Sequence, residues 1–188
     1  MIKLLNYSQD DLCELAEDIN KIAKVRGASE SDVEIDIDSG TSVSVRLKKL
    51  ESVSLNNDKS LSITVYFGKK RGVATTSDFS KEAISSCIDA ACDIAKFTGE
   101  DKAFGLASAS LFPKKKIELD LYYPFEESQD EMINCALEAE EAALAFDKKI
   151  DNSEGANFSS SKNLFVQANS NGFIGGFPSS RHTISCSV

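Results

Sequence analysis

Few side chains in this 188-residue sequence are of the types that carry acid–base, nucleophilic or metal chemistry. There is one histidine, His182, and no cysteine or carboxylate lies near it at the spacing of a metal site. A Ser-His-Asp or Cys-His arrangement stays formally open, because such groups meet in space rather than in sequence. No nucleophile-elbow motif accompanies the histidine, so the sequence does not favour an independent enzyme of the usual kinds.

The cysteines also argue against metal or redox chemistry. Their number is odd, and most of them fall on apolar faces of predicted helices or strands, which is typical of buried free thiols. Cys87 and Cys92 stand five residues apart, about 140° around a helix, which is neither a zinc spacing nor a redox motif. The five are Cys13, Cys87, Cys92, Cys135 and Cys186.

The remaining candidates for a binding site are a glycine-rich stretch, a run of acidic residues and two runs of basic residues. Gly172-x-x-Gly175-Gly176 is followed by Pro178 and a predicted strand, not by the helix that a phosphate loop needs, so hairpin-turn glycines are the better interpretation. The acids between Asp32 and Asp38 are spread along one strand face, which favours solvation over a cation site. The basic runs at 69–71 and 114–116 are expected in solvated turns.

Hydrophobic spacing predicts three helices. Ser8 is expected to cap the first, which ends at Gly27; Ser77 or Ser80 caps the second, which ends at residues 98–99. A capping box, Ser128-x-x-Glu131, opens the third.

Period-two alternation predicts strands separated by short turns at 39–40, 56–58 and 68–72, followed by short strands near the carboxyl end. Short turns between alternating strands indicate an antiparallel meander. We therefore expect an α+β fold in which about three helices pack on a largely antiparallel sheet, with a mixed sheet left open. The segment 179–182 is expected as a loop beside a strand, with either a structural role or a contact to substrate or partner.

Composition excludes several classes. A hydrophobic fraction of 41% and a charged fraction of 27% are ordinary for a folded domain. The net charge of −9 disfavours binding to nucleic acid through phosphate neutralisation. No apolar run approaches the roughly 20 residues of a membrane-spanning helix, and no secretory signal is expected, so we expect a cytoplasmic protein. The chain stops inside an alternating strand, and we expect residues 1–188 to be the front part of a longer protein.

Nine segments in colinear order resemble the amino-terminal domain of the TldD/PmbA family, and more closely its PmbA (TldE) branch. They are residues 40–46, 51–53, 61–66, 75–78, 91–98, 120–124, 152–155, 169–172 and 180–182. The resemblance implies an amino-terminal domain that precedes a β-rich carboxy-terminal domain. It also implies a cytoplasmic metallopeptidase that processes unfolded peptides and is linked to the label "modulator of DNA gyrase".

The resemblance implies that the TldD subunit of this family binds zinc on a His-Glu-x-x-x-His helix. This sequence lacks that motif. No catalytic, metal or cofactor residue is therefore carried over, and zinc is expected in the partner subunit. The matching positions that we expect to contact peptide or partner are Asn169, Asn171, Arg181 and His182.

The expected function is thus a non-catalytic PmbA/TldE-like subunit that pairs with a TldD-like chain, or with a second copy, and helps to enclose the peptide. We expect this chain to be inactive alone, without direct contact to nucleic acid or membrane. One alternative is a stand-alone protein-binding module that regulates DNA gyrase. A second alternative is that the chain is itself a peptidase, which the single histidine disfavours.

Overall fold

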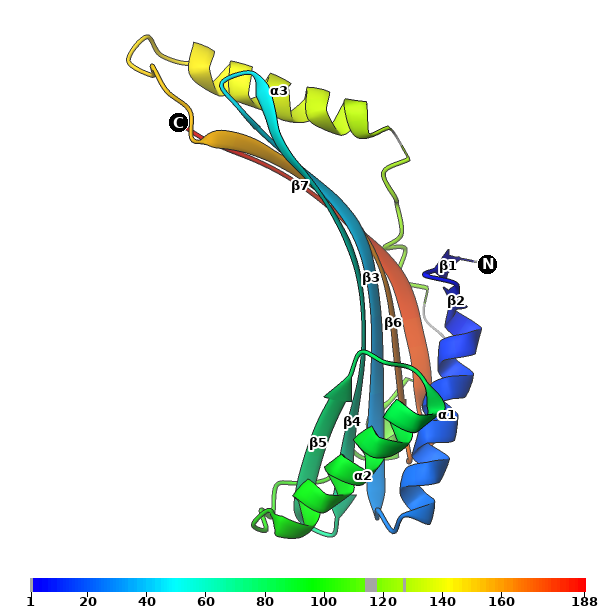
Figure 1. Ribbon diagram of the computed structural model, residues 1–188. Coiled ribbons are helices and arrows are strands. Elements are labelled where there is room, and N and C mark those ends of the chain that lie inside the picture. The colour runs from blue at the N-terminus through cyan, green and yellow to red at the C-terminus, as the bar shows by residue number, and fades with distance from the viewer. Residues whose placement is uncertain (1, 114–117, 127) are drawn as a thin grey trace. The chain divides into compact units, whose positions relative to one another are not determined.

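The computed structural model describes residues 2–113, 118–126 and 128–188, which form three α-helices, one short 3-10 helix and seven strands (Figure 1). In chain order the elements are β1 (Lys3–Leu4), β2 (Tyr7–Ser8), α1 (Gln9–Val25), β3 (Glu30–Arg46), β4 (Lys49–Phe67), β5 (Lys70–Thr76), α2 (Lys81–Phe97), η1 (Ala109–Leu111), α3 (Gln129–Ala145), β6 (Gly155–Asn169) and β7 (Ile174–Ser187). The predicted α+β class with three helices is confirmed.

The main sheet has five strands in the order β5-β4-β3-β6-β7, and β1 pairs with β2 separately. Two-residue turns join β3 to β4 and β4 to β5, which makes both pairs antiparallel. β6 runs against β3, because the Ser170 N–H donates to the Ser31 oxygen at one end and Gly155 lies against Val45 at the other. The sheet is therefore antiparallel, and the mixed arrangement left open by the sequence does not occur in it.

Two of the predicted turns are wrong. Residues 39–40 lie inside β3 and residues 56–58 lie inside β4, because alternation continues on both sides of them. The chain reverses instead at Leu47 and Lys48, whose φ angles are 48° and 62°. A two-residue hairpin turn of this type needs positive φ at both central positions, and neither residue type signals it in the sequence.

The same happens near the carboxyl end, where two long strands replace the short ones expected. The turn lies at residues 170–173, as the Asn-Ser-Asn-Gly run predicts. Gly175, Gly176 and the segment 179–182 are part of β7, so the expected loop at 179–182 is wrong. β7 tolerates Pro178 because it is an edge strand.

The chain divides into two compact units, which are described separately. Unit 1 consists of residues 1–37, 58–120 and 164–178, and unit 2 of residues 38–57, 121–163 and 179–188. In unit 1, α1 and α2 pack on the sheet around fully buried residues such as Leu12, Ile88 and Ile35. In unit 2, α3 packs Met132 and Ala136 against Val43 and Phe158.

Side-chain capping explains where the helices begin. The Ser8 hydroxyl accepts from the Asp11 N–H at 3.2 Å, and the Asp11 carboxylate accepts from the Ser8 N–H at 2.8 Å. Ser80 and Ser128 cap α2 and α3 through one bond each, since their hydroxyls accept from the N–H groups of Ala83 and Glu131. The predicted starts are therefore confirmed, with Ser80 rather than Ser77 before α2.

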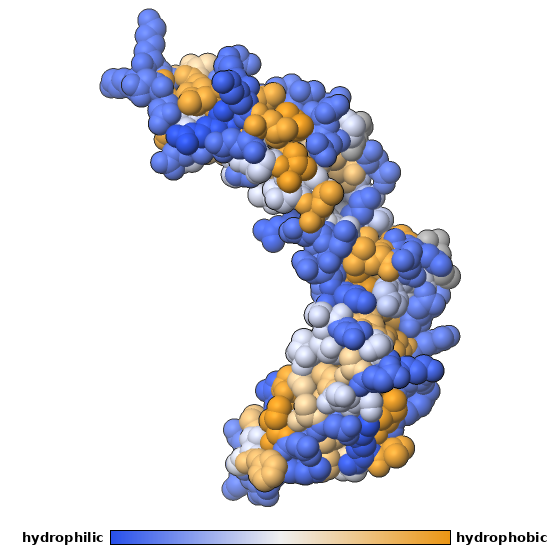
Figure 2. Space-filling model, in the orientation of Figure 1, coloured by the Kyte–Doolittle hydropathy of each residue, from blue (hydrophilic) through white to orange (hydrophobic). Residues whose placement is uncertain are grey.

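The surface of the molecule is mixed. On the face seen in Figure 2, hydrophobic residues form separate patches within a mainly hydrophilic surface. Among the described residues, no helix is both long and apolar enough to cross a membrane.

Candidate functional site

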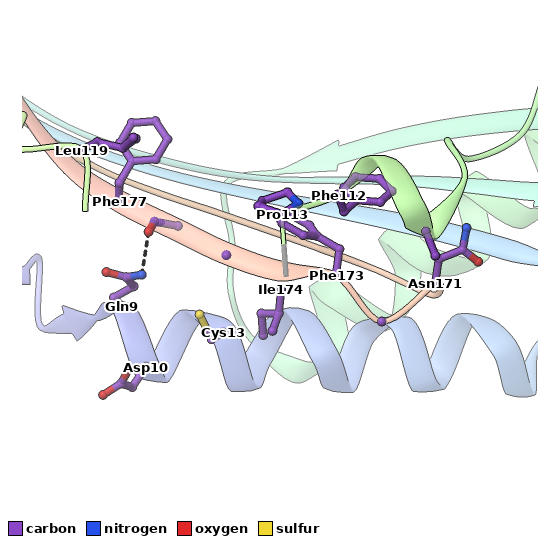
Figure 3. A pocket seen from close by; sticks show the side chains of 14 residues that line it. Gln9, Asp10, Cys13, Phe112, Pro113, Leu119, Asn171, Phe173, Ile174 and Phe177 are labelled. Atoms are coloured by element: carbon purple, nitrogen blue, oxygen red, sulfur yellow. Dashed lines mark hydrogen bonds between the residues drawn. The ribbon is translucent and has the colours of Figure 1, made fainter. Parts of the chain in front are cut away.

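A hollow of about 790 Å³ opens in unit 1 between the amino-terminal turn of α1 and the first residues of β7 (Figure 3). Phe112, Pro113 and Leu119, which follow η1, and the β6–β7 turn complete its walls. Most of the lining is apolar. The apolar side chains include Phe112, Pro113, Leu119, Phe173, Ile174 and Phe177. A volume of this size is typical of a site that takes a small molecule or a few side chains of a peptide.

Two glycines leave the wall formed by β7 without side chains. A Cβ at Gly175 would lie 3.0 Å from the Phe173 ring, and a Cβ at Gly176 would collide with the backbone oxygen of Phe165. Phe173 is itself held by stacking on Phe112, with ring centroids 4.9 Å apart. Glycine at 176 thus lets β7 lie close to β6, and glycine at 175 leaves room for the Phe173 ring that lines the hollow.

The main chain of β7 faces this hollow at the edge of the sheet. The Gln9 amide Nε2 donates to the Gly176 oxygen at 2.7 Å, which is the dashed contact in Figure 3. The outward oxygen of Gly176 is thus bonded to α1. The apolar walls of the hollow are suited to contact apolar side chains.

Two of the four predicted contact residues lie beside this hollow, Asn169 at the end of β6 and Asn171 in the turn that follows. Asn169 is 5% exposed, and its Oδ1 accepts from the N–H groups of Asn171 and Phe173 at 3.0 and 3.2 Å. Asn171 is exposed, lines the hollow, and donates from Nδ2 to the Ala107 oxygen at 3.2 Å. Asn169 thus shapes the turn, whereas Asn171 is placed where a ligand would meet it.

The other two predicted residues belong to unit 2. His182 contacts the Tyr123 carbonyl oxygen through Nε2 at 2.7 Å and the Ser160 hydroxyl through Nδ1 at 3.1 Å. A carbonyl oxygen only accepts, so Nε2 carries the hydrogen, and in the neutral ring Nδ1 accepts from Ser160. With the Ser180 hydroxyl, which accepts from the Tyr123 N–H, His182 ties the segment near Tyr123 to β7.

Arg181 precedes His182 in the same strand, and adjacent strand residues point to opposite faces. Arg181 is exposed and forms no ion pair with any residue that the structure describes. One ligand lying on a single face of β7 therefore does not contact both residues. The sequence analysis groups Arg181 with His182 because it expects both residues in one loop, where a single ligand could contact both.

The face of unit 2 to which Arg181 belongs carries mainly hydroxyl and amide groups. Its residues alternate with those that face α3, such as Val43, Val45, Ala156 and Phe158. They include Ser42, Ser44, Asn157, Ser159, Arg181, Thr183 and Ser185. The only helix of unit 2 among the described residues is α3, so no described helix covers this polar face.

Burial shifts the pKa of several titratable side chains. Burial raises the pKa of the Cys87 and Cys92 thiols, which keeps them protonated and unreactive. Burial also raises the pKa of Asp32, although the Gln167 amide that binds its carboxylate opposes this. Among the described residues, no three His, Cys, Asp or Glu side chains gather so as to hold a metal ion.

Comparison with protein families shows two matches along the chain. Residues 32–95 match the model of the PmbA/TldA metallopeptidase domain 1, and residues 122–188 match that of the PmbA/TldA metallopeptidase central domain. Together the two models account for 131 of the 188 residues, from 64 in the first and 67 in the second.

Two curated relatives share 40% identity with the chain. The Metalloprotease PmbA homolog of Haemophilus influenzae aligns over 185 residues, which are 98% of this chain and 41% of that protein. Metalloprotease PmbA of Escherichia coli O157:H7 aligns over 158 residues, 84% of this chain and 35% of that protein. The chain thus spans about two fifths of the length of these relatives.

Two solved structures share the fold. A candidate modulator of DNA gyrase from Bacteroides thetaiotaomicron superposes with a TM-score of 0.84 at 21% identity, over 95% of this chain and 41% of that one. TldE from Thermococcus kodakarensis superposes with a TM-score of 0.74 at 17% identity, over 92% and 38%. At these identities the likeness concerns the fold alone.

Proposed function

Because this chain belongs to the PmbA/TldD family of metallopeptidases, we propose that it is the amino-terminal part of a PmbA/TldE-like subunit. In this proposal the subunit acts in the cytoplasm and does not cleave peptides itself. It holds unfolded peptide for a TldD-like partner, and a β-rich domain follows it in the complete protein.

The non-catalytic part of this proposal rests on the resemblance to the PmbA/TldE branch, for which zinc is expected in the TldD-like partner. Within this chain the one histidine, His182, uses both ring nitrogens to tie the segment near Tyr123 to β7. We assign the zinc to the TldD-like partner.

The observation that carries the peptide-holding role is the apolar hollow beside the edge of β7. Its walls offer contact to apolar side chains of many kinds. The polar face of unit 2 adds hydroxyl and amide groups without a strong preference for side-chain charge. Such surfaces suit a subunit that accepts many unfolded peptides.

The first test distinguishes the roles of the two subunits in zinc binding and hydrolysis. Each full-length protein is purified alone, its zinc content is measured by plasma mass spectrometry, and hydrolysis of an unfolded model peptide is followed for each and for the mixture. We expect activity in the mixture and neither zinc nor activity in this protein alone. Stoichiometric zinc together with hydrolysis by this protein alone would overturn the assignment.

The second test concerns the hollow. Phe177→Ala in the full-length protein should raise the KM of the mixture, because the substitution removes a ring from the wall. Phe97→Ala is the matched control, since Phe97 is 90% exposed at the end of α2 and lines no part of the hollow. Equal KM values for both variants would show that peptide does not use this hollow.

The rival role, a stand-alone module that regulates DNA gyrase, is not favoured. The relatives with 40% identity are metalloproteases, whereas the likeness to the candidate gyrase modulator is a likeness of fold.

A further inference from the structure

A short segment of unit 2, residues 121–123, lies along the edge of β7 and covers part of it. The Ser180 N–H donates to the Leu121 oxygen at 2.9 Å. The Tyr123 N–H donates to the Ser180 hydroxyl at 2.8 Å, and His182 Nε2 donates to the Tyr123 oxygen at 2.7 Å. All three contacts use main-chain atoms of residues 121–123, so they do not depend on the side chains of this segment, which we call the cover.

Two of the three side chains of the cover are exposed. Leu121 is 46% exposed and Tyr123 is 61% exposed, and the hydrogen bonds of Tyr123 to β7 lie at the surface. Asp120, directly before the cover, has a φ angle of 52°, which is unfavourable for residues other than glycine. Pro124, directly after it, has no N–H with which to continue the pairing. Segments that bury little side-chain surface and are held by exposed hydrogen bonds open most readily.

The chain beyond the cover is anchored more firmly. The Phe125 ring packs against the Phe158 ring with centroids 5.1 Å apart, and its centroid lies 6.0 Å from that of His182. Phe125 thereby joins the apolar cluster beneath α3. The cover can therefore leave β7 while the residues that follow it stay attached to unit 2.

We propose that an unfolded peptide substrate displaces the cover from β7 and takes over its hydrogen bonds. The inference rests on the proposed peptide-holding function. The groups that the cover releases are the Ser180 N–H, the Ser180 hydroxyl and the His182 Nε2–H. Each of them binds a main-chain oxygen or N–H, which every peptide offers, and strand edges accept extended peptides in this way. His182 then contacts the cover in the free protein and the peptide in the complex.

The cover competes with the peptide and so weakens its binding. The apparent dissociation constant equals the intrinsic constant divided by the fraction of molecules in which the edge is uncovered. Loss of one hydrogen bond that holds the cover should raise this fraction about two- to tenfold. A substitution that weakens only the cover should therefore improve peptide binding, a result that a purely structural role of the segment does not predict.

The first test weakens the cover and leaves β7 unchanged. Tyr123→Pro removes the N–H that donates to Ser180. In the mixture of the two full-length subunits it should lower the KM for an unfolded model peptide about two- to tenfold. Tyr123→Ala is the matched control, because it also removes the phenol ring but retains the N–H, and its KM should stay near that of the wild type. If the proline variant, shown to be folded by circular dichroism, has a KM equal to or above that of the alanine variant, the proposal is wrong.

Hydrogen exchange tests the displacement without a substitution. The mixture is treated with a zinc chelator so that the peptide stays uncleaved. Saturating peptide should then speed exchange at residues 121–123 and slow it at residues 180–182. Residues 121–123 that stay protected with peptide present would overturn the proposal. Failure of the proposed function looks different, because the mixture then shows no hydrolysis or Phe177→Ala leaves its KM unchanged.

Discussion

Glu140 on α3 provides the sharpest test of what holds unit 2 together. Its side chain is fully buried, and its two carboxylate oxygens accept from the N–H groups of Leu47 and Lys48, each at 2.8 Å. These are the two residues of the β3–β4 turn whose φ angles are positive. The carboxylate thus connects the β3–β4 turn to α3 through two hydrogen bonds. Glu140→Gln should weaken this connection and lower the free energy of unfolding.

The magnitude follows from the hydrogen bonds. In the glutamine variant one oxygen still accepts, but the other position carries an NH₂ group that faces a backbone donor. A hydrogen bond to a charged group contributes about 1.5–3 kcal/mol, and a buried donor without a partner costs about 1–3 kcal/mol. Because Leu47 and Lys48 are themselves partly exposed, we expect a loss near the lower end, about 2 kcal/mol.

Glu141→Gln is the matched control. Glu141 is the next residue and forms an ion pair with Lys48 at 3.0 Å, but both side chains are about two-thirds exposed. An exposed ion pair of this kind contributes about 0–1 kcal/mol. Urea denaturation measures the free energy of unfolding for both variants, and hydrogen exchange at the Leu47 and Lys48 amides reports the turn directly.

The pH dependence has a defined sign. Burial opposes the charge of Glu140, but the Ser153 hydroxyl and the amides of Lys48 and Leu47 outweigh it and lower the pKa of the carboxyl from its usual 4.5. The stabilisation is therefore present above that usual value and is lost as the pH falls through the lowered pKa of the folded state. The difference between the wild-type and Glu140→Gln proteins should shrink on acidification. Equal losses for the two glutamine variants, or a difference that does not change with pH, would refute this reasoning.

Three further substitutions test other parts of the fold by urea denaturation. Gly72→Ala should destabilise unit 1 by several kcal/mol, because the added Cβ would collide with the Ala91 oxygen of α2 and lie 2.6 Å from the Ala95 nitrogen. Gly99→Ala is the control, because a Cβ there meets no other atom, and it should change the stability little. Ser8→Ala removes the hydroxyl side of the α1 capping box, while the Asp11 carboxylate still accepts from the backbone N–H of residue 8, and should cost about 1 kcal/mol; an unchanged midpoint would show that the hydroxyl cap is dispensable. Asn20→Ala should lower the free energy of unfolding by about 2–3 kcal/mol, because the buried Asn20 amide donates to the oxygens of Ala16 and Ala168 and accepts from Ser31. Asp18→Ala, on the exposed side of α1, is the control and should be nearly neutral.

Local features of the sequence determined much of the fold. Ser8, Ser80 and Ser128 start the three helices because their hydroxyls satisfy amide groups within the same turn. The alternation of Val33, Ile35 and Ile37 places them in the core because strand residues alternate between faces. These interactions span only a few residues, so residue spacing alone reveals them. The shortage of metal-ligating side chains in this sequence can also be read from the sequence alone.

Tertiary structure decided what depends on partners far along the chain. The turn at Leu47 and Lys48 is held by Glu140, more than 90 residues away, and neither residue signals a turn locally. Arg181 and His182 are separated onto opposite faces because β6 and β7 continue as one long pair where a loop was expected. Gly175 lies against the Phe173 ring and Gly176 against the Phe165 oxygen of β6, close approaches that only the folded chain produces.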